Sequence, residues 1–343
     1  MKLLETLSES FGPSGFEDET RQIVIDELKP LCDKVWTNTM GSVVGFRAGK
    51  GPKSKKKKIM VAGHMDEIGF LVSHVDEKTG FIRITPVGGF DPKTLMAQRV
   101  MVFGKGKHRL TGLLNLAGKP IHVQTPEDKK KELKISDFYV DLGMPGKEVA
   151  RKVEVGDPVA WRRDFAKMGE CYNCKSMDDR VGVYVMIEAL RKAKGNTNDI
   201  YAVGTVQEEV GLRGATTSAY EIEPDIAIAL DTTLAMDTPG NEPHNKVAEL
   251  GKGITISIMN SAVISDRELV KELRSIAKKK KIPVQLEILP RGGTDAGAMQ
   301  RTKAGARAVT LSIPTRNIHS VNETVHETDV KAGINLLAAY LSQ

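Results

Sequence analysis

The sequence predicts an α/β domain with a mostly parallel central sheet flanked by helices, together with an inserted small all-β domain. Two observations lead to this prediction. From Asp178 onward, strand-type runs alternate with helical runs, which is the pattern of a parallel sheet covered by helices. In the stretch before Asp178, short β-type runs separated by turns replace that alternation. We therefore expect one domain from residues 1–66 and 163–343, and a second, inserted domain from residues 67–162.

The predicted elements follow in chain order. Two helical stretches, residues 3–9 and 17–28, open the chain, and short strands then run up to Met60. The β-rich stretch contains four strand-type runs: GFLVSHV, GFIRITPVG, RVMVFGK and DPVAW. After it come a helix, two buried strands and an amphipathic helix: VGVYVMIEALRKA, DIYAVGTVQEE, DIAIALD and DRELVKELRSIAKK. A strand, a short helix, a strand and a closing helix complete the chain: PVQLEIL, TDAGAMQR, ARAVTLSIP and VKAGINLLAAYLS.

The composition narrows the class of protein. Of 343 residues, 40% are hydrophobic and 27% are charged, which is enough apolar material for one large domain or two ordinary ones. The net charge of +6 is modest, because 44 acidic residues are interspersed with 50 basic ones, and we expect neither nucleic acid nor a membrane as a partner. No run approaches the roughly 18 apolar residues of a membrane span, and the N-terminus lacks the apolar core of an export signal.

The three cysteines, Cys32, Cys171 and Cys174, are too few for a disulfide framework. We therefore expect a cytoplasmic protein with reduced thiols. Cys171 and Cys174 have the CxxC spacing of a zinc or redox motif, but no second pair of ligands accompanies them and their context does not open a helix. We interpret both as ordinary strand residues.

Residues of the metal-ligand type follow the predicted strands. In open α/β sheets, binding sites gather beyond the carboxyl ends of the strands. Four strand-type runs end on, or run into, a His, Asp or Glu, and one helix begins with a pair of carboxylates. These residues are His64 with Asp66, Glu208 with Glu209, Asp231, His319, and Asp178 with Asp179. Uncompensated charges gathered at one rim would be costly, and a bound cation removes that cost.

Two histidines and three carboxylates suit a pair of zinc-like ions with a bridging water. Such ions lower the pKa of the water, polarise a carbonyl group and orient the substrate. One carboxylate has to stay unliganded to move protons, and the adjacent Glu208 and Glu209 can divide these duties.

Taken singly, each residue also has an ordinary interpretation. Asp178 and Asp231 suit helix N-caps, and a lone histidine is more often a surface or core residue than a ligand. The joint placement of the residues is what favours a metal site. We give the ordinary interpretation to the five other histidines: His74, His108, His122, His244 and His326.

Five motifs occur in the order GHMDEIGF, SMDDRVG, VQEEVGLRGA, ALDTT and IHS. Together they resemble the glutamyl/leucyl/lysyl aminopeptidase family of cobalt- or zinc-dependent enzymes, which includes the tetrahedral aminopeptidases and some members labelled endoglucanases. The resemblance covers essentially the whole chain. It implies a metalloaminopeptidase, a hydrolase of the exopeptidase type, that holds two zinc or cobalt ions per subunit and removes N-terminal residues from peptides.

The resemblance also implies a role for each site residue. His64 and Asp231 bind one ion, Glu209 and His319 bind the other, and Asp178 bridges both. Glu208 is the general base, and Asp66 orients the imidazole ring of His64 and raises its basicity. The Asp178–Asp179 peptide bond is expected to be cis.

The resemblance further implies self-association through the inserted domain, with six dimers forming a tetrahedral shell of twelve subunits. It also puts the segment RGGTDAGAMQ near the substrate pocket. That segment matches neither phosphate-loop pattern, and we expect Thr294 or Asp295 to cap the following helix. The preferred N-terminal residue, whether acidic, basic or aliphatic, stays open.

The sequence leaves two alternative functions open. A glycoside hydrolase could use two of the acidic residues, but it leaves His64 and His319 without a role, and 5% aromatic residues is few for a sugar site. A non-catalytic metal-binding protein would tolerate replacement of Glu208, which binds no metal in this scheme.

Overall fold

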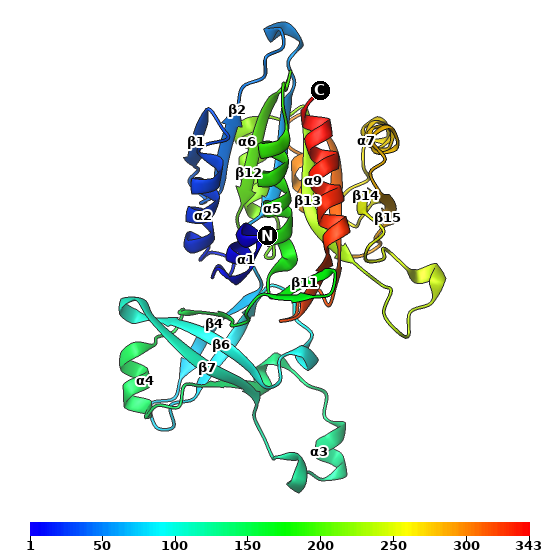
Figure 1. Cartoon of the computed structure of the whole chain (residues 1–343). Coiled ribbons are helices and arrows are strands. Elements are labelled where there is room, and N and C mark those ends of the chain that lie inside the picture. Colours follow the sequence, from blue (N-terminus) through cyan, green and yellow to red (C-terminus); the bar gives the residue numbers. More distant parts are fainter. The chain divides into compact units, whose positions relative to one another are not determined.

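A computed structural model describes residues 1–343, apart from the side chain of Lys107. The chain forms two compact units (Figure 1). The first consists of Met1–Glu67, Phe165–Ile318 and Asn322–Gln343, and the second of Ile68–Asp164 and His319–Val321. Each unit has a hydrophobic core of its own, and the two are described separately.

The first unit is built on an eleven-stranded sheet. Its strand order is β1-β2-β12-β3-β13-β16-β17-β11-β10, and β14 pairs with both β16 and β15 beside this path. The strands are β1 Lys34–Thr37, β2 Val43–Arg47, β3 Lys58–His64, β10 Ala166–Met168, β11 Cys171–Cys174, β12 Asp199–Thr205, β13 Ile226–Leu234, β14 Ile254–Met259, β15 Val284–Ile288, β16 Arg307–Arg316 and β17 Glu323–His326.

Parallel pairing is confined to part of this sheet. β3 pairs in parallel with β12 and β13, β13 with β16, and β14 with β15. The other pairs, including β1/β2, β16/β17 and β10/β11, are antiparallel. The prediction of a mostly parallel sheet is therefore right for the central strands and wrong for the margins. The pairs β1/β2, β10/β11 and β16/β17 are joined by short connections, which permit only antiparallel pairing. The antiparallel pairs β2/β12, β11/β17 and β14/β16 instead join strands that lie far apart in the chain.

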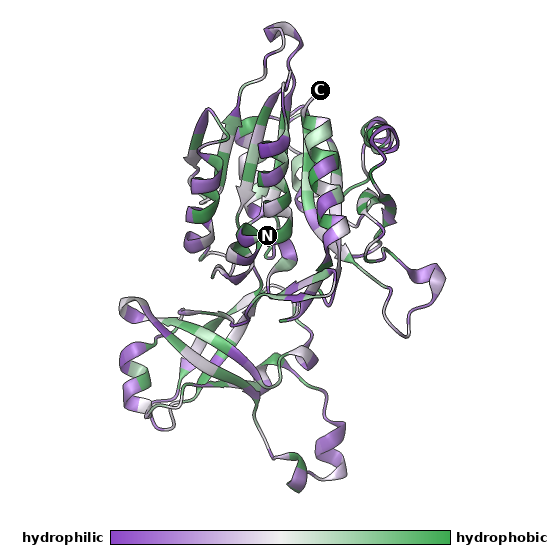
Figure 2. Cartoon of the chain, viewed as in Figure 1, coloured by the Kyte–Doolittle hydropathy of each residue, from purple (hydrophilic) through white to green (hydrophobic). Residues whose placement is uncertain are grey.

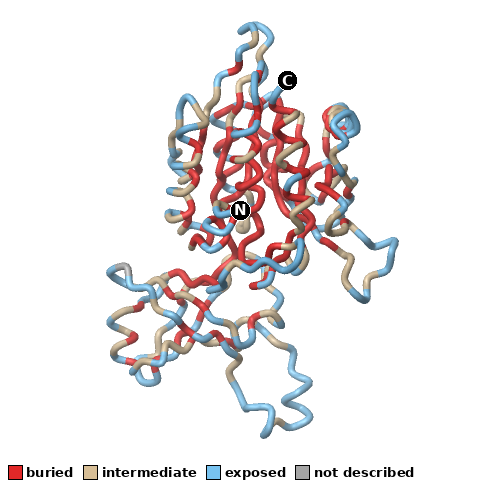
Figure 3. The backbone as a smooth tube through the Cα atoms, in the orientation of Figure 1, coloured by how far each residue is buried: buried red, intermediate tan, exposed pale blue. Residues whose placement is uncertain are grey.

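Helices cover both faces of the sheet (Figure 1). They are α1 Lys2–Glu9, α2 Asp18–Leu28, α5 Met177–Lys192, α6 Arg213–Ile222, α7 Arg267–Lys280, α8 Asp295–Gln300 and α9 Glu327–Leu341. Successive side chains of a strand point to opposite faces. In β13, Ile228 joins the core that contains α5 and α9, whereas Ala229 joins the core that contains α6 and α8. Figure 3 shows the resulting buried interior along the central strands.

The second unit is a closed barrel of six strands in the order β4-β5-β8-β7-β6-β9, with all neighbours antiparallel. The strands are β4 Gly69–Val75, β5 Ile82–Val87, β6 Gln98–Gly104, β7 His108–Leu116, β8 Phe138–Asp141 and β9 Pro158–Trp161. Closure leaves no free edge in the barrel. Phe70 packs edge-to-face on Trp161 in its core, with ring centroids 5.5 Å apart.

Two short helices in the second unit were not predicted: α3 Pro126–Lys130 and α4 Gly146–Lys152. α3 is strongly hydrophilic (Figure 2) and buries none of its residues, so it shows no apolar periodicity. Its N-terminus is stabilised by a capping box between Thr125 and Asp128.

No described helix combines the length and the apolar character needed to cross a bilayer. Cys171 and Cys174 lie in β11, as predicted, and the described cysteines form no disulfide.

Candidate metal centre

The carboxyl ends of the central strands position the predicted ligands. His64 is the last residue of β3, and Glu208 and Glu209 follow β12 in the loop before α6. Asp178 lies at the start of α5, and the Asp178–Asp179 peptide bond is cis, as expected. Because β3 and β12 are adjacent and parallel, their ends lie at the same edge of the sheet.

Asp231 lies inside β13 and not at its end. The strand continues to Leu234 because residues 232–234 stay in register with β16. Thr232 and Thr233 are β-branched and suit a strand, so the end of the apolar run is not the end of the strand. The Asp231 carboxylate therefore projects from the face of the sheet near its carboxyl edge.

His64, Asp178 and Asp231 form a compact group. One potential ligand atom from each lies within 4.8 Å of the other two, and all three residues are buried. Oδ2 of Asp231 is buried and has no hydrogen-bond partner among the described residues. Burial, together with the charges of Asp179 and Asp178, raises the pKa of Asp231 well above its usual value. A bound cation would interact with the Asp231 oxygen that makes no hydrogen bond and would offset the repulsion among the buried carboxylates. The group therefore fits a metal ion.

Asp178 also contributes to a second pair of candidate ligands. One of its ligand atoms lies within 4.8 Å of a carboxylate oxygen of Glu209. A carboxylate shared in this way has the position that a bridging ligand needs. His319 lies in the connection between β16 and β17, in the left-handed backbone region with φ 61°, and clusters with the second unit.

Asp66 holds both the His64 ring and the loop that carries the two glutamates. Nδ1 of His64 lies 3.4 Å from Oδ1 of Asp66 and 3.0 Å from its backbone carbonyl, which leaves Nε2 facing Asp178. The backbone N–H groups of Glu208 and Glu209 donate to the Asp66 carboxylate over 3.0 and 3.2 Å. Burial alone would raise the pKa of Asp66, but His64 and the hydroxyl of Ser14 hold it below its usual value.

Glu208 lies within reach of the same group. Its Oε2 is 4.0 Å from Nε2 of His64. Burial raises the pKa of Glu208 well above its usual value; His64 opposes the shift, and the carboxylates of Asp231 and Asp295 add to it. A carboxyl group with a raised pKa beside a reaction centre suits proton transfer near neutral pH.

A buried ion network next to Asp178 was not foreseen from the sequence. Nζ of Lys175 lies 2.7 and 2.9 Å from the two carboxylate oxygens of Glu67, and Nη2 of Arg180 lies 3.7 Å from the same group. The hydroxyl of Ser176 donates a short hydrogen bond to Glu67. All four side chains are buried. The only local signal was that Lys175 and Arg180 flank the carboxylate pair, and charge spacing alone does not reveal a distant partner.

Asp295 also faces the centre from the start of α8. The hydroxyl of Thr205 donates to its Oδ2 over 2.5 Å, while Oδ1 is buried without a hydrogen-bond partner among the described residues. Burial raises the pKa of Asp295 to about 6. The expected capping bond of this helix is absent: Thr294 occupies the N-cap, but its hydroxyl pairs with Thr310 over 2.8 Å.

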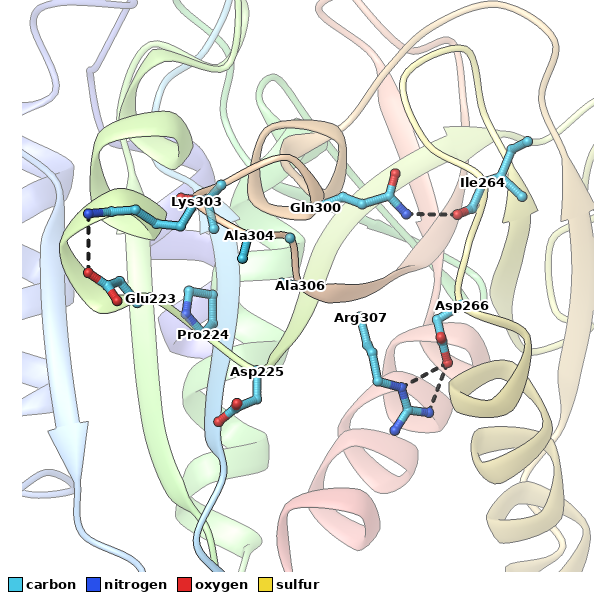
Figure 4. Close-up of a pocket in the computed structure, with 12 residues that line it drawn as sticks. Glu223, Pro224, Asp225, Ile264, Asp266, Gln300, Lys303, Ala304, Ala306 and Arg307 are labelled. Atoms are coloured by element: carbon cyan, nitrogen blue, oxygen red, sulfur yellow. Dashed lines mark hydrogen bonds and ion pairs between the residues drawn. The ribbon is translucent and has the colours of Figure 1, made fainter.

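A pocket of about 740 Å³ lies at the opposite end of the sheet, where β13 and β16 begin (Figure 4). Two ion pairs line it, Lys303 with Glu223 at 3.1 Å and Arg307 with Asp266 at 2.8 Å, and Asp225 accepts a hydrogen bond from the backbone N–H of Lys58.

Comparisons with known proteins agree with this geometry. The model of the M42 glutamyl aminopeptidase family matches residues 41–336. A putative aminopeptidase of Acetivibrio thermocellus is 39% identical over 98% of this chain and 96% of its own length. The lysyl aminopeptidase of Pyrococcus furiosus is 35% identical over 100% of this chain and 96% of its own length.

Solved structures show the same fold. An aminopeptidase from Desulfurococcus kamchatkensis superimposes with a TM-score of 0.94 at 38% identity, covering 100% of this chain and 94% of that one. The TET1 peptidase of Pyrococcus horikoshii, described as assembling into a tetrahedron or a large octahedral shell, has a TM-score of 0.86 at 29% identity, covering 99% and 98%. A protein of Thermotoga maritima described as an endoglucanase has a TM-score of 0.80 at 27% identity, covering 98% and 96%.

Proposed function

The chain belongs to the M42 glutamyl aminopeptidase family and is an aminopeptidase, and from this premise we propose that it cleaves peptides with water activated at a centre of two divalent ions. The observation that carries the proposal is the buried group of His64, Asp178 and Asp231, in which Oδ2 of Asp231 has no hydrogen-bond partner among the described residues. A buried carboxylate pair beside a histidine is costly without a cation.

In this proposal His64 and Asp231 would hold one ion, Glu209 would hold the other, and Asp178 would be shared between them. The second ion needs a further ligand, and we assign His319 to it. Both neighbours of its connection, β16 and β17, are strands of the sheet that carries the other ligands, which supports the assignment. Zinc and cobalt both suit imidazole and carboxylate ligands.

The two ions would supply an activated water and polarise the scissile carbonyl. Glu208, which binds no ion in the scheme, accepts a proton from that water and passes it to the leaving amine. Asp66 orients the Nδ1–H of His64. It also accepts hydrogen bonds from the backbone N–H groups of Glu208 and Glu209, and so holds the proposed base and a proposed ligand in position.

We propose that the subunits associate through the second unit into a shell of twelve. The support is the similarity to the TET1 peptidase, for which a tetrahedral assembly is described. The substrates of the proposed enzyme would be peptides that are small or unfolded enough to enter such a shell. The cytoplasmic location stays a prediction.

Metal removal tests the proposed function. Dialysis against a chelator should abolish hydrolysis of aminoacyl chromogenic substrates, because the water loses its activation, and zinc or cobalt should restore it. Activity that survives complete removal of metal, checked by elemental analysis, would exclude the two-ion mechanism.

The same preparation tests the alternative of a glycoside hydrolase, which the similarity to the Thermotoga maritima protein keeps open. That chemistry needs two carboxyl groups and no metal. Chelator-resistant release of sugar from a soluble glucan would favour it over the peptidase.

A further inference from the structure

A second polar cluster lies beside the metal centre and has no part in the proposed mechanism. It is formed by one carboxyl group and four hydroxyl groups from four neighbouring strands. We call it the Glu287 cluster; its members are Thr233 of β13, Thr255 and Ser257 of β14, Glu287 of β15 and Ser312 of β16. Each member is at most 2% exposed.

The register of the sheet explains why these residues meet. Ser257 pairs with Glu287 across β14 and β15, and Thr255 pairs with Ser312 across β14 and β16. Residues paired in this way have Cβ atoms about 5 Å apart and point to the same face. Ser312 also pairs with Asp231, and Thr233 lies two residues beyond Asp231 on the same face of β13.

The carboxyl group of Glu287 has no cationic partner in the part of the chain that the structure describes. No described ion pair includes it, and none of the leading influences on its pKa is a basic group. Burial raises the pKa of Glu287, and the surrounding hydroxyl groups of Thr255, Thr233, Ser312 and Ser257 act against the shift. A buried carboxylate without a counter-charge is unfavourable unless it is neutralised.

Most of the hydroxyl groups around this carboxylate make no hydrogen bond of regular geometry with a described residue. Among the described residues, Thr255 donates a hydrogen bond of regular geometry to Glu287 over 2.6 Å. The hydroxyl groups of Thr233, Ser257 and Ser312 lie close enough to Glu287 to lower its pKa, but their buried oxygens make no hydrogen bond of regular geometry with any described residue. Buried polar atoms are normally satisfied, so three unsatisfied oxygens around one carboxylate indicate a missing ligand.

We propose that the Glu287 cluster binds a monovalent cation, either an alkali-metal ion or an ammonium group. One carboxylate balances one positive charge, and the neutral hydroxyl oxygens replace the hydration shell of the ion. The cluster contains no imidazole or thiolate that would select a transition metal, and a second carboxylate that would balance a divalent ion is absent from it.

An ammonium group could come from free ammonium or from the side chain of an N-terminal lysine in a substrate. The second source rests on the proposed function, because it requires a peptide bound at the neighbouring metal centre. In either case the cation lies next to Asp231, at the neighbouring strands β13 and β16. Its binding therefore helps to hold the side chain of Asp231, a proposed metal ligand, in position.

Thermal unfolding of the metal-loaded protein tests the free ion. Tm is measured in tetramethylammonium chloride and then in the chlorides of sodium, potassium, rubidium and ammonium at equal ionic strength. A bound cation should raise Tm by a few degrees, since a ligand that binds only the folded state stabilises it. Glu287→Gln, which keeps the shape and removes the charge, should abolish the difference. Ser42→Ala removes a buried hydroxyl that has no hydrogen-bond partner among the described residues and directly precedes β2, which pairs with none of the strands of the cluster; this variant should keep the difference.

Diffraction from wild-type crystals gives a test that needs no variant. Crystals soaked in rubidium or thallium chloride should show an anomalous peak beside the Glu287 carboxylate. Hydrolysis of lysyl and leucyl chromogenic substrates tests the other source: if Glu287→Gln loses activity selectively on the lysyl substrate while Tm shows no ion dependence, the cation belongs to the substrate.

The absence of all three effects, namely an ion-dependent Tm, an anomalous peak and a selective loss on the lysyl substrate, would overturn the proposal. A peak that persists in Glu287→Gln crystals would overturn it too. Neither Tm nor diffraction depends on peptidase activity, so failure of the cation site and failure of the proposed function give different results.

Discussion

At the scale of single residues, the two neighbouring glutamates have different surroundings. Glu208 lies near Nε2 of His64, and its pKa is raised by burial. Glu209 contributes a ligand atom near Asp178. The backbone N–H groups of both donate to Asp66, so a single carboxylate sets the positions of the proposed base and of a proposed ligand.

Replacing the proposed base should separate catalysis from metal binding. We expect Glu208→Gln to keep two ions per chain and to lower kcat by about 10²- to 10⁴-fold, because the amide cannot accept the proton. Aminoacyl chromogenic assays and elemental analysis measure the two effects. Glu242→Gln, an exposed change of the same kind, should leave both unchanged. Wild-type turnover in Glu208→Gln would show that another group is the base.

The assignment of His319 predicts a change in metal content. His319→Ala removes one imidazole from the second proposed ion, so the metal-to-protein ratio should fall from two toward one. Elemental analysis after dialysis measures the ratio. His122→Ala, which removes an exposed histidine of the second unit, serves as the matched control. An unchanged ratio in His319→Ala would contradict the ligand scheme.

At the scale of elements, the start of α5 depends on charges that come from elsewhere in the chain. Lys175 and Glu67 are 108 positions apart, yet they form a buried ion pair that borders Asp178. Asp179, in turn, accepts hydrogen bonds from the backbone N–H groups of His64 and Gly182 over 3.2 and 3.1 Å. These contacts join the end of β3 to the start of α5 and so bring two proposed ligands together.

Breaking this ion pair should weaken both the fold and the metal site. We expect Lys175→Met to lower the free energy of unfolding by about 3 kcal/mol or more, because the buried Glu67 carboxylate keeps only the more distant Arg180 as a counter-charge among the described residues. Metal affinity should fall as well, since Asp178 loses its support. Urea unfolding and metal titration measure the two quantities.

The matched control is Lys271→Met, which removes a lysine from an exposed pair with Glu268 on α7. Exposed pairs contribute little, so this variant should unfold as the wild type does. If Lys175→Met bound metal as tightly as Lys271→Met, the network would be a purely structural feature.

At the scale of the whole molecule, the second unit is the proposed region of contact between subunits. The closed barrel of the second unit has no free strand edge, so the proposed association through this unit would use side chains and loops in place of strand pairing. Exposed apolar residues are available there, among them Ile121 and Val123, which are 67% and 63% exposed. Such residues are suited to contacts between subunits.

The proposed assembly predicts a particle of twelve chains of 37.5 kDa each. Light scattering on the purified protein measures the mass. The double substitution of Ile121 and Val123 by Asp should yield smaller particles, because it places charges in an apolar contact. Ile264→Asp, an equally exposed site of the first unit, should not do so. A monomeric wild type would refute the shell.

The sequence by itself determined the class of the fold, the family and the residue types of the candidate centre. These were accessible because they depend on local properties: apolar periodicity, the polar residue that follows each strand, and five motifs in order. The extent of parallel pairing was only partly accessible, since strand direction at the margins depends on which distant strands become neighbours.

Only the tertiary structure decided which distant residues come together as buried charged and polar groups. The pairing of Lys175 with Glu67, the approach of Asp295 to Glu208 and the Glu287 cluster each join segments that lie far apart in the chain. Their physical basis is burial: a charge or hydroxyl group that would be solvated in an isolated segment must find a partner once the sheet and its helices exclude water. No pattern along the sequence records which partner that is.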